Sequence, residues 1–316
     1  MTATLSLTAA PGKVGAYARL AKLDVWDYYL ALPLALSLAG TWLDPRVLAT
    51  LAVFLIGTVA VVASAVAFDD VTGFCDGSDA ANYGRNAPAR KLARKPLLTG
   101  ELTVIDAVRF GWSAAAVGAG LWAVAIAIAP FGPMWTIALI AVCLVTAVQY
   151  SWGIKISYRG WQEVFLAGFG TGLVLAALGL ISGSLNAFAL VQAVLFGLGP
   201  LLFGVYSNTR DARGDARVGR PTVAVLLSAQ GNRLFIVALS VTEIALIVLS
   251  AGLGAAPWWF SVAMLPAIGM RVAQLQRGIG LGDLLGGRTL GLRAHRVMVV
   301  SLIVVNLLAP TLGATQ

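Results

Sequence analysis

Charged side chains are scarce in this chain. They make up 11% of its 316 residues, whereas hydrophobic residues make up 59%, and the mean hydropathy is strongly positive. A soluble domain of this length cannot bury so much apolar side chain, so lipid must be its solvent. The composition excludes an ordinary soluble protein and predicts an integral membrane protein. It also argues against nucleic-acid binding, because no basic soluble domain exists to carry that role.

Cysteine and histidine are almost absent. Cys75 and Cys143 match no metal-binding spacing and no disulfide framework, so we interpret both as small apolar residues. The only histidine, His295, lies between two arginines at the start of the last apolar segment. We expect it at the membrane surface and not as a catalytic base. The best clue to function is therefore the presence of two clusters of acidic residues.

Long apolar runs divide the chain into segments of about 17 to 25 residues, each able to cross the hydrocarbon core as a helix. The predicted fold class is all-α, a polytopic membrane protein with about nine transmembrane helices. We expect residues 274–293, which are rich in glycine, to form a flexible polar loop or a short surface helix. The predicted spans lie near residues 25–43, 48–68, 104–129, 133–150, 163–182, 187–207, 232–254, 256–273 and 294–312.

An acidic loop follows the second span, and another follows the sixth span. This layout is expected if two four-helix units arose by duplication and met around one shared cavity, with a last helix added at the end. No polar segment is long enough to fold separately. We therefore treat residues 1–316 as a single transmembrane domain.

Basic residues predict the orientation, because Lys and Arg next to membrane spans are retained on the cytoplasmic side. With the N-terminus inside, alternating spans place all 22 Lys and Arg residues except Arg46 on the cytoplasmic side. The turns at 130–132, 183–186 and 255–256 carry no charge. Both acidic clusters are then predicted to face the cytoplasm, with the protein in the inner or plasma membrane of the cell.

The second acidic cluster follows the sixth span and contains Asp211 and Asp215. If the helix continues, these carboxylates share one face, with Asn208 one turn earlier. Two like charges at this spacing repel, and Mg²⁺ reverses the sign of that interaction by binding carboxylates, waters and phosphate oxygens. Basic residues that follow, such as Arg217, suggest an anionic second ligand. Metal plus diphosphate satisfies both; the alternative is a solvated loop whose carboxylates pair with neighbouring arginines.

The first acidic cluster follows the second span. In a helix extended from that span, Asp69 and Asp76 lie on one face, with Asp79 three residues beyond Asp76. Gly77 could instead break the helix and let the loop carry Asp79 back to a metal. Because the cluster adjoins an apolar span, a partly buried site is favoured over surface hydration. The candidate metal ligands are Asp69, Asp70, Asp76, Asp79, Asp211 and Asp215.

The second acidic cluster and two further stretches complete a pattern. Residues 208–222 hold the Asn-Thr-Arg-Asp-Ala-Arg-Gly-Asp motif with Gly219 and Thr222, residues 94–97 read Arg-Lys-Pro-Leu, and residues 150–163 contain Tyr-Ser-Trp-Gly, Tyr-Arg-Gly and a glutamate. Together with the first cluster, they resemble the UbiA superfamily of intramembrane prenyltransferases over most of the chain. The second motif is closest to the branch that makes menaquinone precursors.

The resemblance implies a helical bundle around a central cavity, with Mg²⁺ held by both Asp-rich motifs and a prenyl diphosphate whose chain lies among the helices. Metal ions and basic side chains stabilise the departing diphosphate, and an aromatic acceptor captures the allylic cation. Physical reasoning agrees, because a dry chamber keeps water from quenching that cation. By this resemblance the catalytic residues are Asp70, Asp76, Asp211, Asp215 and Tyr150, and the diphosphate contacts are Arg94, Lys95, Lys155, Arg217 and Asn208.

The first motif departs from the family pattern of Asn-Asp followed by Asp three residues later. The corresponding residues are Asp69, Asp70 and Gly73, and Asp76 is an extra carboxylate that replaces the missing one. Some superfamily members are terpene cyclases, in which the substrate's own double bonds capture the cation, and altered first motifs occur among them. A cyclase needs aromatic rings around its chamber; at span ends such rings also act as interface anchors. The available rings are Trp26, Tyr28, Tyr29, Trp112, Trp122, Tyr150, Trp152 and Tyr206.

A transporter is the alternative from another class, because carboxylates inside membrane spans often serve transport. Glu243 lies within the seventh predicted span. It is alone there, and we expect a hydrogen bond to a neighbouring helix instead.

Overall fold

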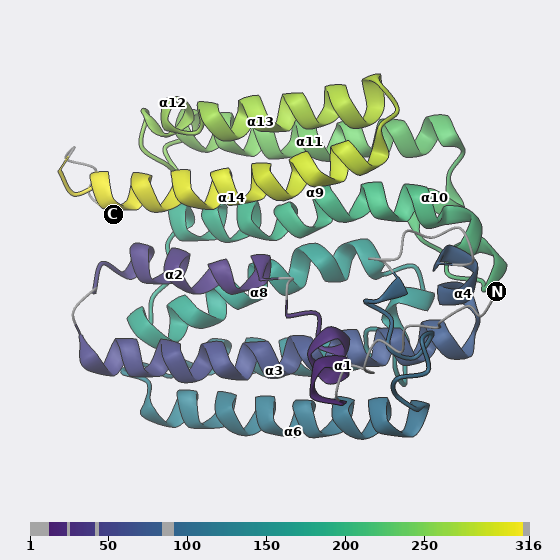
Figure 1. Ribbon diagram of the computed structural model, residues 1–316. Helices are drawn as coiled ribbons and strands as arrows, with labels where there is room; N and C mark the ends of the chain where they lie inside the picture. The colour runs from purple at the N-terminus through teal and green to yellow at the C-terminus, as the bar shows by residue number, and fades with distance from the viewer. Residues whose placement is uncertain (1–12, 24–25, 42–43, 84–91, 312–316) are drawn as a thin grey trace, which may run out of the picture.

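The computed structural model describes residues 13–23, 26–41, 44–83 and 92–311. Over these residues it contains helices and no strands, which confirms the all-α prediction. The long helices run side by side in a bundle (Figure 1), with α3 against α6, α8 against α9, and α9 against α14. The helices are α1 Lys13–Leu20, α2 Ala31–Ala39, α3 Pro45–Cys75, α4 Ser78–Tyr83, α6 Val104–Ile128, α7 Met134–Gln149, α8 Gln162–Ser182, α9 Ala187–Arg217, α10 Val223–Leu226, α11 Ala229–Gly252, α12 Phe260–Ala263, α13 Leu265–Leu275 and α14 Leu284–Leu308.

Six of the described helices are long and apolar enough to cross a membrane: α3, α6, α8, α9, α11 and α14. Two shorter apolar segments, Asp27–Ala39 and Met134–Gln149, match the first and fourth predicted spans. The eighth predicted span is divided between α12 and α13. The count of nine spans therefore stays a prediction, as do the pseudo-repeat and the single domain over residues 1–316.

The prediction that residues 274–293 form a flexible polar loop or a short surface helix is wrong, because most of the segment belongs to the end of α13 and the start of α14. A π-helical turn at Gln276–Gly280 extends α13, and α14 begins at Leu284, where Asp283 accepts a hydrogen bond from Gly286 N at 2.8 Å. The glycines serve close packing here: a Cβ on Gly278 would lie 2.1 Å from Cε1 of the Tyr206 ring. A composition that is typical of a loop thus belongs to a tight helix crossing.

Small residues bring the long helices into close contact. At the crossing of α3 and α6, a Cβ on Gly118 would lie 2.6 Å from Val61 Cγ2. At the crossing of α8 and α9, a Cβ on Gly170 would lie 3.0 Å from Gly197 Cα. Such close approaches allow membrane helices to pack.

His295 is fully buried, so its predicted place at the membrane surface is wrong. Because α14 begins earlier than expected, His295 lies inside the helix and faces α9. Its ring lies edge-on to Phe196, with centroids 4.9 Å apart. A Cβ on Gly199 would clash with the imidazole, so that glycine makes room for it.

Glu243 of α11 makes the contact to a neighbouring helix that its isolation predicted. Its carboxylate oxygens accept hydrogen bonds from Arg271 of α13 at 2.6 Å and 2.8 Å. Both side chains are buried. A closed ion pair explains this intramembrane carboxylate without a transport role.

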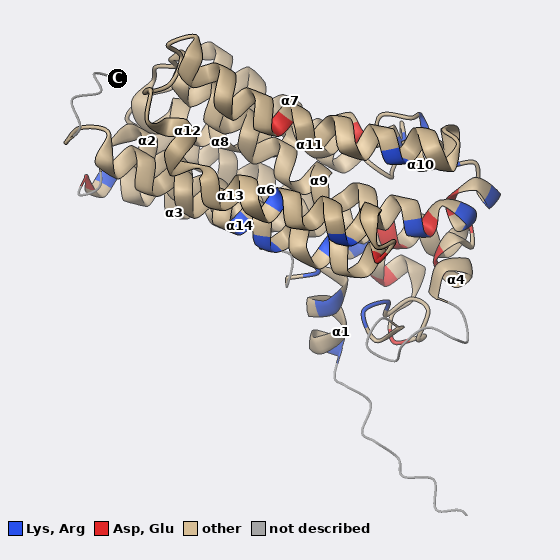
Figure 2. Ribbon diagram, turned by 90° about the horizontal axis from the view of Figure 1, so that it is seen from above, with Lys and Arg blue, Asp and Glu red and all other residues tan. Residues whose placement is uncertain are grey.

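Most charged residues gather at the end of the bundle where α4 and α10 lie (Figure 2). The exception noted in the sequence, Arg46, lies in the first turn of α3 and donates to the carbonyls of Ile128 and Ala129 at the end of α6, at 2.8 Å and 2.9 Å. One end of the bundle is therefore rich in charge, and that end holds both acidic motifs.

Candidate active site

The first acidic motif straddles the end of α3. Asp69 and Asp70 lie in its last turns, and Asp76 is the residue that follows it. Gly77 has a φ of +82°, a left-handed conformation that favours glycine and ends the helix. The chain then turns into α4, whose first turn carries Asp79. Of the two alternatives, the structure has the second: α3 extends past the apolar run only to Cys75, and Gly77 then breaks the helix, so Asp79 lies on a separate helix.

The second motif lies inside α9, which continues to Arg217 as expected. Asp211 and Asp215 are thus one turn apart on the same helix. Asp211 is half-buried and pairs with Arg210 at 3.0 Å. Asp215 is only 5% exposed and has no ion pair among the described residues. Asn208, one turn earlier, is buried.

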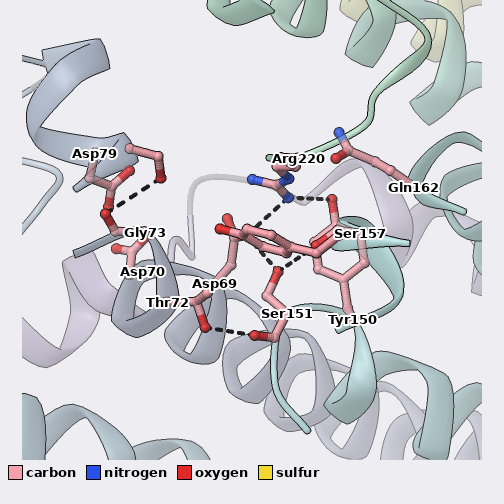
Figure 3. Close-up of polar contacts among 12 residues, drawn as sticks. Asp69, Asp70, Thr72, Gly73, Asp79, Tyr150, Ser151, Ser157, Gln162 and Arg220 are labelled. Carbon is pink, nitrogen blue, oxygen red and sulfur yellow. Dashed lines mark hydrogen bonds and ion pairs between the residues drawn. The ribbon is translucent and has the colours of Figure 1, made fainter. Parts of the chain in front are cut away.

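The two motifs meet. Arg220, just beyond the second motif, donates to Asp69 Oδ1 at 3.2 Å and to the Tyr150 hydroxyl at 3.3 Å (Figure 3). On the other side of the site, α4 packs on α9 so closely that a Cβ on Gly214 would lie 1.9 Å from Asn82 Oδ1. Helices far apart in the chain therefore present their acidic ends to one another.

Lysines neutralise the buried carboxylates of the first motif. Lys95 Nζ lies 2.8 Å from Asp70 Oδ1 and 2.7 Å from Asp79 Oδ1, and Lys22 Nζ lies 2.7 Å from Asp70 Oδ1. Burial raises the pKa of the Asp79 carboxyl to about 6, although Lys95 opposes that shift. Burial acts to lower the pKa of Lys95, but Asp70 and Asp79 more than offset it and hold that pKa above its ordinary value.

Gly73, the residue that departs from the family pattern, lies next to the Asp79 carboxylate. A Cβ there would lie 2.9 Å from Asp79 Cγ, and its three nearest neighbours would all be Asp79 atoms. The glycine makes room for a carboxylate carried by α4 instead of one carried by α3. Asp76 is exposed and accepts hydrogen bonds from the Tyr158 hydroxyl and from Ser78 N.

The loop after α7 is fastened to the first motif. Ser151 Oγ donates to Asp69 Oδ1 at 2.8 Å, and Thr72 Oγ1 donates to the Ser151 carbonyl at 2.6 Å. Tyr150, beside them, is held by Arg220. Burial raises the pKa of the Tyr150 hydroxyl, although Arg220 opposes the shift. This phenol therefore stays protonated near neutral pH.

A basic pocket of about 240 Å³ opens beside the two motifs. It unites Arg94 and Lys95, two of the diphosphate contacts expected from the sequence, with Asp211. The other two basic candidates lie outside it: Arg217 is exposed, and exposed Lys155 places Nζ 5.5 Å from the centre of the Tyr158 ring. The pocket is lined by Lys22, Tyr83, Arg94, Lys95, Ser207, Arg210, Asp211, Leu285 and Arg288.

Several residues of this region were not singled out as site residues from the sequence. Arg220 counted only among the basic residues that follow the second cluster, Lys22 counted only toward the orientation, and Ser151 had no assigned role. The signal for Arg220 was its position after Gly219, whose φ of +68° turns the chain back from α9 toward the first motif. Only the fold shows which basic residues face the carboxylates.

Within the described ranges, no group of three or more His, Cys, Asp or Glu side chains is arranged to hold a metal ion. Lys22, Lys95 and Arg220 pair with the carboxylates of the first motif instead. Asp70 Oδ2 is nevertheless buried and accepts no hydrogen bond from any described residue. A buried carboxylate oxygen without a partner is unfavourable unless a ligand reaches it.

The fold and the site define the class of protein: a membrane-embedded helix bundle in which two acidic motifs meet at one end. The chain belongs to the UbiA prenyltransferase family, whose model matches residues 29–278. It is thus an integral membrane protein of a family of prenyl-related enzymes. No curated protein sequence matches the chain.

Solved structures share this fold. A UbiA homologue from Aeropyrum pernix K1 is 17% identical, with a TM-score of 0.66 over 88% of this chain and 97% of that one. A UbiA homologue from Archaeoglobus fulgidus bound to DMAPP and Mg²⁺ is 16% identical, with a TM-score of 0.63 over 90% and 99%. A digeranylgeranylglyceryl phosphate synthase structure is 13% identical, with a TM-score of 0.61 over 93% and 98%. At such identities the likeness shows the fold alone.

Proposed function

We propose that the chain is an Mg²⁺-dependent intramembrane prenyltransferase, which ionises a prenyl diphosphate and transfers the prenyl group to an aromatic acceptor. The observation that carries the proposal is the meeting of the two acidic motifs, linked by Arg220 and Asp69 at 3.2 Å. The Archaeoglobus fulgidus homologue, with the same fold, was solved with Mg²⁺ and either DMAPP or GPP.

The metal would be held by carboxylates of both motifs, and the residues present fit it. Asp70 keeps one buried oxygen without a partner, and Asp215 is buried without an ion pair in the described part of the chain. When bound, Mg²⁺ offsets the negative charge that develops on the departing diphosphate. The proposed ligands are Asp69, Asp70, Asp76, Asp79, Asp211 and Asp215.

The basic pocket would bind the diphosphate. Arg94 and Lys95 face it, and guanidinium and ammonium groups bind phosphate oxygens through charge-assisted hydrogen bonds. Lys155, Arg217 and Asn208 are proposed as further contacts. Tyr150, held by Arg220, would lie near the reacting carbon, where apolar surroundings keep water from the cation.

One observation favours cyclisation as the second candidate. Four aromatic rings form a continuous series beside the first motif: Tyr150 to Phe165 with centroids 4.6 Å apart, Phe165 to Phe169 at 5.3 Å, and Phe169 to Tyr28 at 5.4 Å. Ring faces stabilise positive charge, so this series suits a cation that migrates along its own chain. Gly73 agrees with the altered first motifs of that group.

Product analysis separates the two candidates. Purified protein would be incubated with Mg²⁺ and geranyl, farnesyl or geranylgeranyl diphosphate, with and without aromatic acceptors. We expect diphosphate release coupled to a prenylated acceptor. A cyclic hydrocarbon or alcohol formed without an acceptor would overturn the transferase proposal in favour of the cyclase.

Single substitutions test the metal ligands. Asp211→Asn and Asp215→Asn should each lower the rate of diphosphate release by about 10²- to 10³-fold, the size of effect seen when one stabilising group at a developing charge is lost. Asp106→Asn is the control, because Asp106 lies at the start of α6, where it accepts a hydrogen bond from Thr103 N. Unchanged turnover in the Asp215 variant would show that the assigned metal site is wrong.

A further inference from the structure

The first turn of α8 carries a buried carboxylate, Glu163, to which the proposed reaction gives no role. The residue is 6% exposed and has no ion pair within the described ranges. Its Oε1 accepts hydrogen bonds from Asn208 Nδ2 of α9 and from Val223 N of α10, both at 3.1 Å. Its other oxygen, Oε2, is buried and accepts none from any described residue. The carboxylate therefore acts through Oε1, which joins α8 to two other segments of the chain.

The contact with Val223 fixes the turn that follows α9. Val223 is the first residue of α10, and Thr222 before it makes no side-chain cap. The first N–H groups of a helix have no partner within the helix, so Glu163 supplies an acceptor from α8. A Cβ on Gly160, just before α8, would lie 3.7 Å from the Pro221 carbonyl oxygen. The turn after α9 therefore packs next to the start of α8.

The same turn carries Arg220, the residue that links the two acidic motifs. Its backbone N donates to the Asp215 carbonyl at 2.9 Å, which ties the turn to the end of α9. Its guanidinium donates to Asp69 and to the Tyr150 hydroxyl. Only two residues separate Arg220 from Val223, so a shift of the chain at Val223 would move the guanidinium away from both partners.

A second contact aligns α9 itself. Asn208 lies one turn before Asp211, and the start of α8 holds its amide at both ends. Its Nδ2 donates to Glu163 Oε1, and its Oδ1 accepts a hydrogen bond from Gln162 Nε2 at 2.9 Å. The first turn of α8 thus fixes the second motif on either side of its carboxylates, at Asn208 before them and near Arg220 after them.

We propose that Glu163 is a positioning residue of the prenyltransferase and acts through Arg220. By holding Val223 N it fixes the turn, and so keeps the Arg220 guanidinium against Tyr150 and the first motif. This inference rests on the proposed function, in which Asp69 binds Mg²⁺ and Tyr150 lies near the reacting carbon. Groups that orient a metal ligand contribute to activity although they touch neither the metal nor the substrate.

Val223→Pro tests the contact from its donor side and leaves Glu163 in place. Proline is tolerated at the first position of a helix and favours an extended residue before it, and Thr222 already has a φ of −66° and a ψ of 157°. At saturating Mg²⁺, kcat for diphosphate release should fall by about 10- to 100-fold, the usual loss when a group that orients a metal ligand is removed. KM for the prenyl diphosphate should stay near the wild-type value, because neither residue of the contact lines the basic pocket.

Substitutions at Glu163 give the matched comparison. Glu163→Gln keeps an amide oxygen that accepts hydrogen bonds from Asn208 and Val223, so its kcat should stay near that of wild type. Glu163→Leu removes the acceptor, and its kcat should fall at least as far as that of Val223→Pro. The combined variant, Glu163→Leu with Val223→Pro, should be no slower than Glu163→Leu alone, because both substitutions remove the same contact.

Hydrogen exchange follows the turn without any need for activity. In the detergent-purified full chain, the amides of residues 216–222 should exchange faster in Val223→Pro and Glu163→Leu than in wild type, and at the wild-type rate in Glu163→Gln. Asn306→Leu is the control, because it removes buried hydrogen bonds toward the other end of α14 from the basic pocket. It should lower the unfolding temperature but change neither this exchange nor kcat.

Wild-type exchange in Val223→Pro would overturn the inference, because the contact would then not hold the turn. Faster exchange with an unchanged kcat would also overturn it, since the contact would then serve the fold alone. So would a combined variant in which the two losses in kcat multiply. Absence of diphosphate release by wild type would contradict the proposed function itself, whereas release by wild type and by Val223→Pro at equal rates would contradict only the positioning role.

Discussion

At the scale of single residues, Lys95 holds two carboxylates of the first motif together. It is buried and lies within 2.8 Å of both Asp70 and Asp79. Removing one partner of a buried ion pair costs about 3 to 5 kcal/mol. Lys95→Met should therefore lower the free energy of unfolding by that amount in EDTA. Saturating Mg²⁺ should restore part of it, because a ligand of the folded state stabilises that state.

The measurement is thermal unfolding in detergent with EDTA and with Mg²⁺. Arg277→Met is the matched control, since Arg277 pairs with Asp283 at the surface, where an ion pair contributes about 1 kcal/mol or less. A Lys95 variant that loses the same stability with and without Mg²⁺ would contradict the view that lysine and metal share these carboxylates.

The buried pair of Glu243 and Arg271 gives a second prediction at this scale. Glu243→Gln leaves the guanidinium without its counter-ion and should destabilise the protein by about 3 kcal/mol or more. Replacing both residues with Met should recover most of that loss, because an apolar pair avoids the desolvation of two charges. Thermal unfolding of the single and double variants checks this. A double variant less stable than the single one would show a role beyond pairing.

The sequence identified the acidic residues of the candidate site but not the contacts between them. Asp211 and Asp215 could be paired in advance, because i and i+4 positions share a helix face. The link from Arg220 to Asp69 spans 151 positions, and no local pattern reports such a distance. The same holds for Glu163, whose missing partner becomes visible only when Asn208 and Val223 are placed around it.

At the scale of helices, apolar length predicted most elements, while their ends depended on local chemistry. Thr103 and Asp106 form the capping box that begins α6. The start of α14 was missed. Glycines suggested a loop there, but they allow close packing on Tyr206, which belongs to α9. Tertiary contact, and not propensity, decided that boundary.

The crossing of α3 and α6 supplies a prediction for these elements. Gly118→Leu would place its Cβ 2.6 Å from Val61 Cγ2 and 3.0 Å from Val61 N, so the helices must separate. Overpacking of this kind costs about 1 to 3 kcal/mol, and we expect a lower unfolding temperature in detergent. Gly120→Leu, two residues further along α6 in open space, should unfold near the wild-type temperature. Equal effects of both variants would indicate a loss of helix flexibility instead of a clash.

At the scale of the whole molecule, charge is polarised along the bundle. Figure 2 shows most charged residues at the end that holds the acidic motifs. Composition alone predicted a membrane protein, and the positions of Lys and Arg predicted that this end faces the cytoplasm. The sequence could not show that the two motifs form one site, because that depends on how helices from both halves of the chain pack.

The native cysteines test the orientation without disturbing the bundle. Cys75 is exposed at the end of α3, beside the first motif, whereas Cys143 is buried in α7. A membrane-impermeant maleimide should label Cys75 in inverted membrane vesicles and leave it unlabelled in intact cells, while Cys143 stays unlabelled in both. As a control, Trp258→Cys in a Cys75→Ser background should show the reverse pattern, because Trp258 is 80% exposed in the turn between α11 and α12, on the predicted outer side. Labelling of Cys75 in intact cells would place the acidic motifs on the outer side and contradict the orientation predicted from the basic residues.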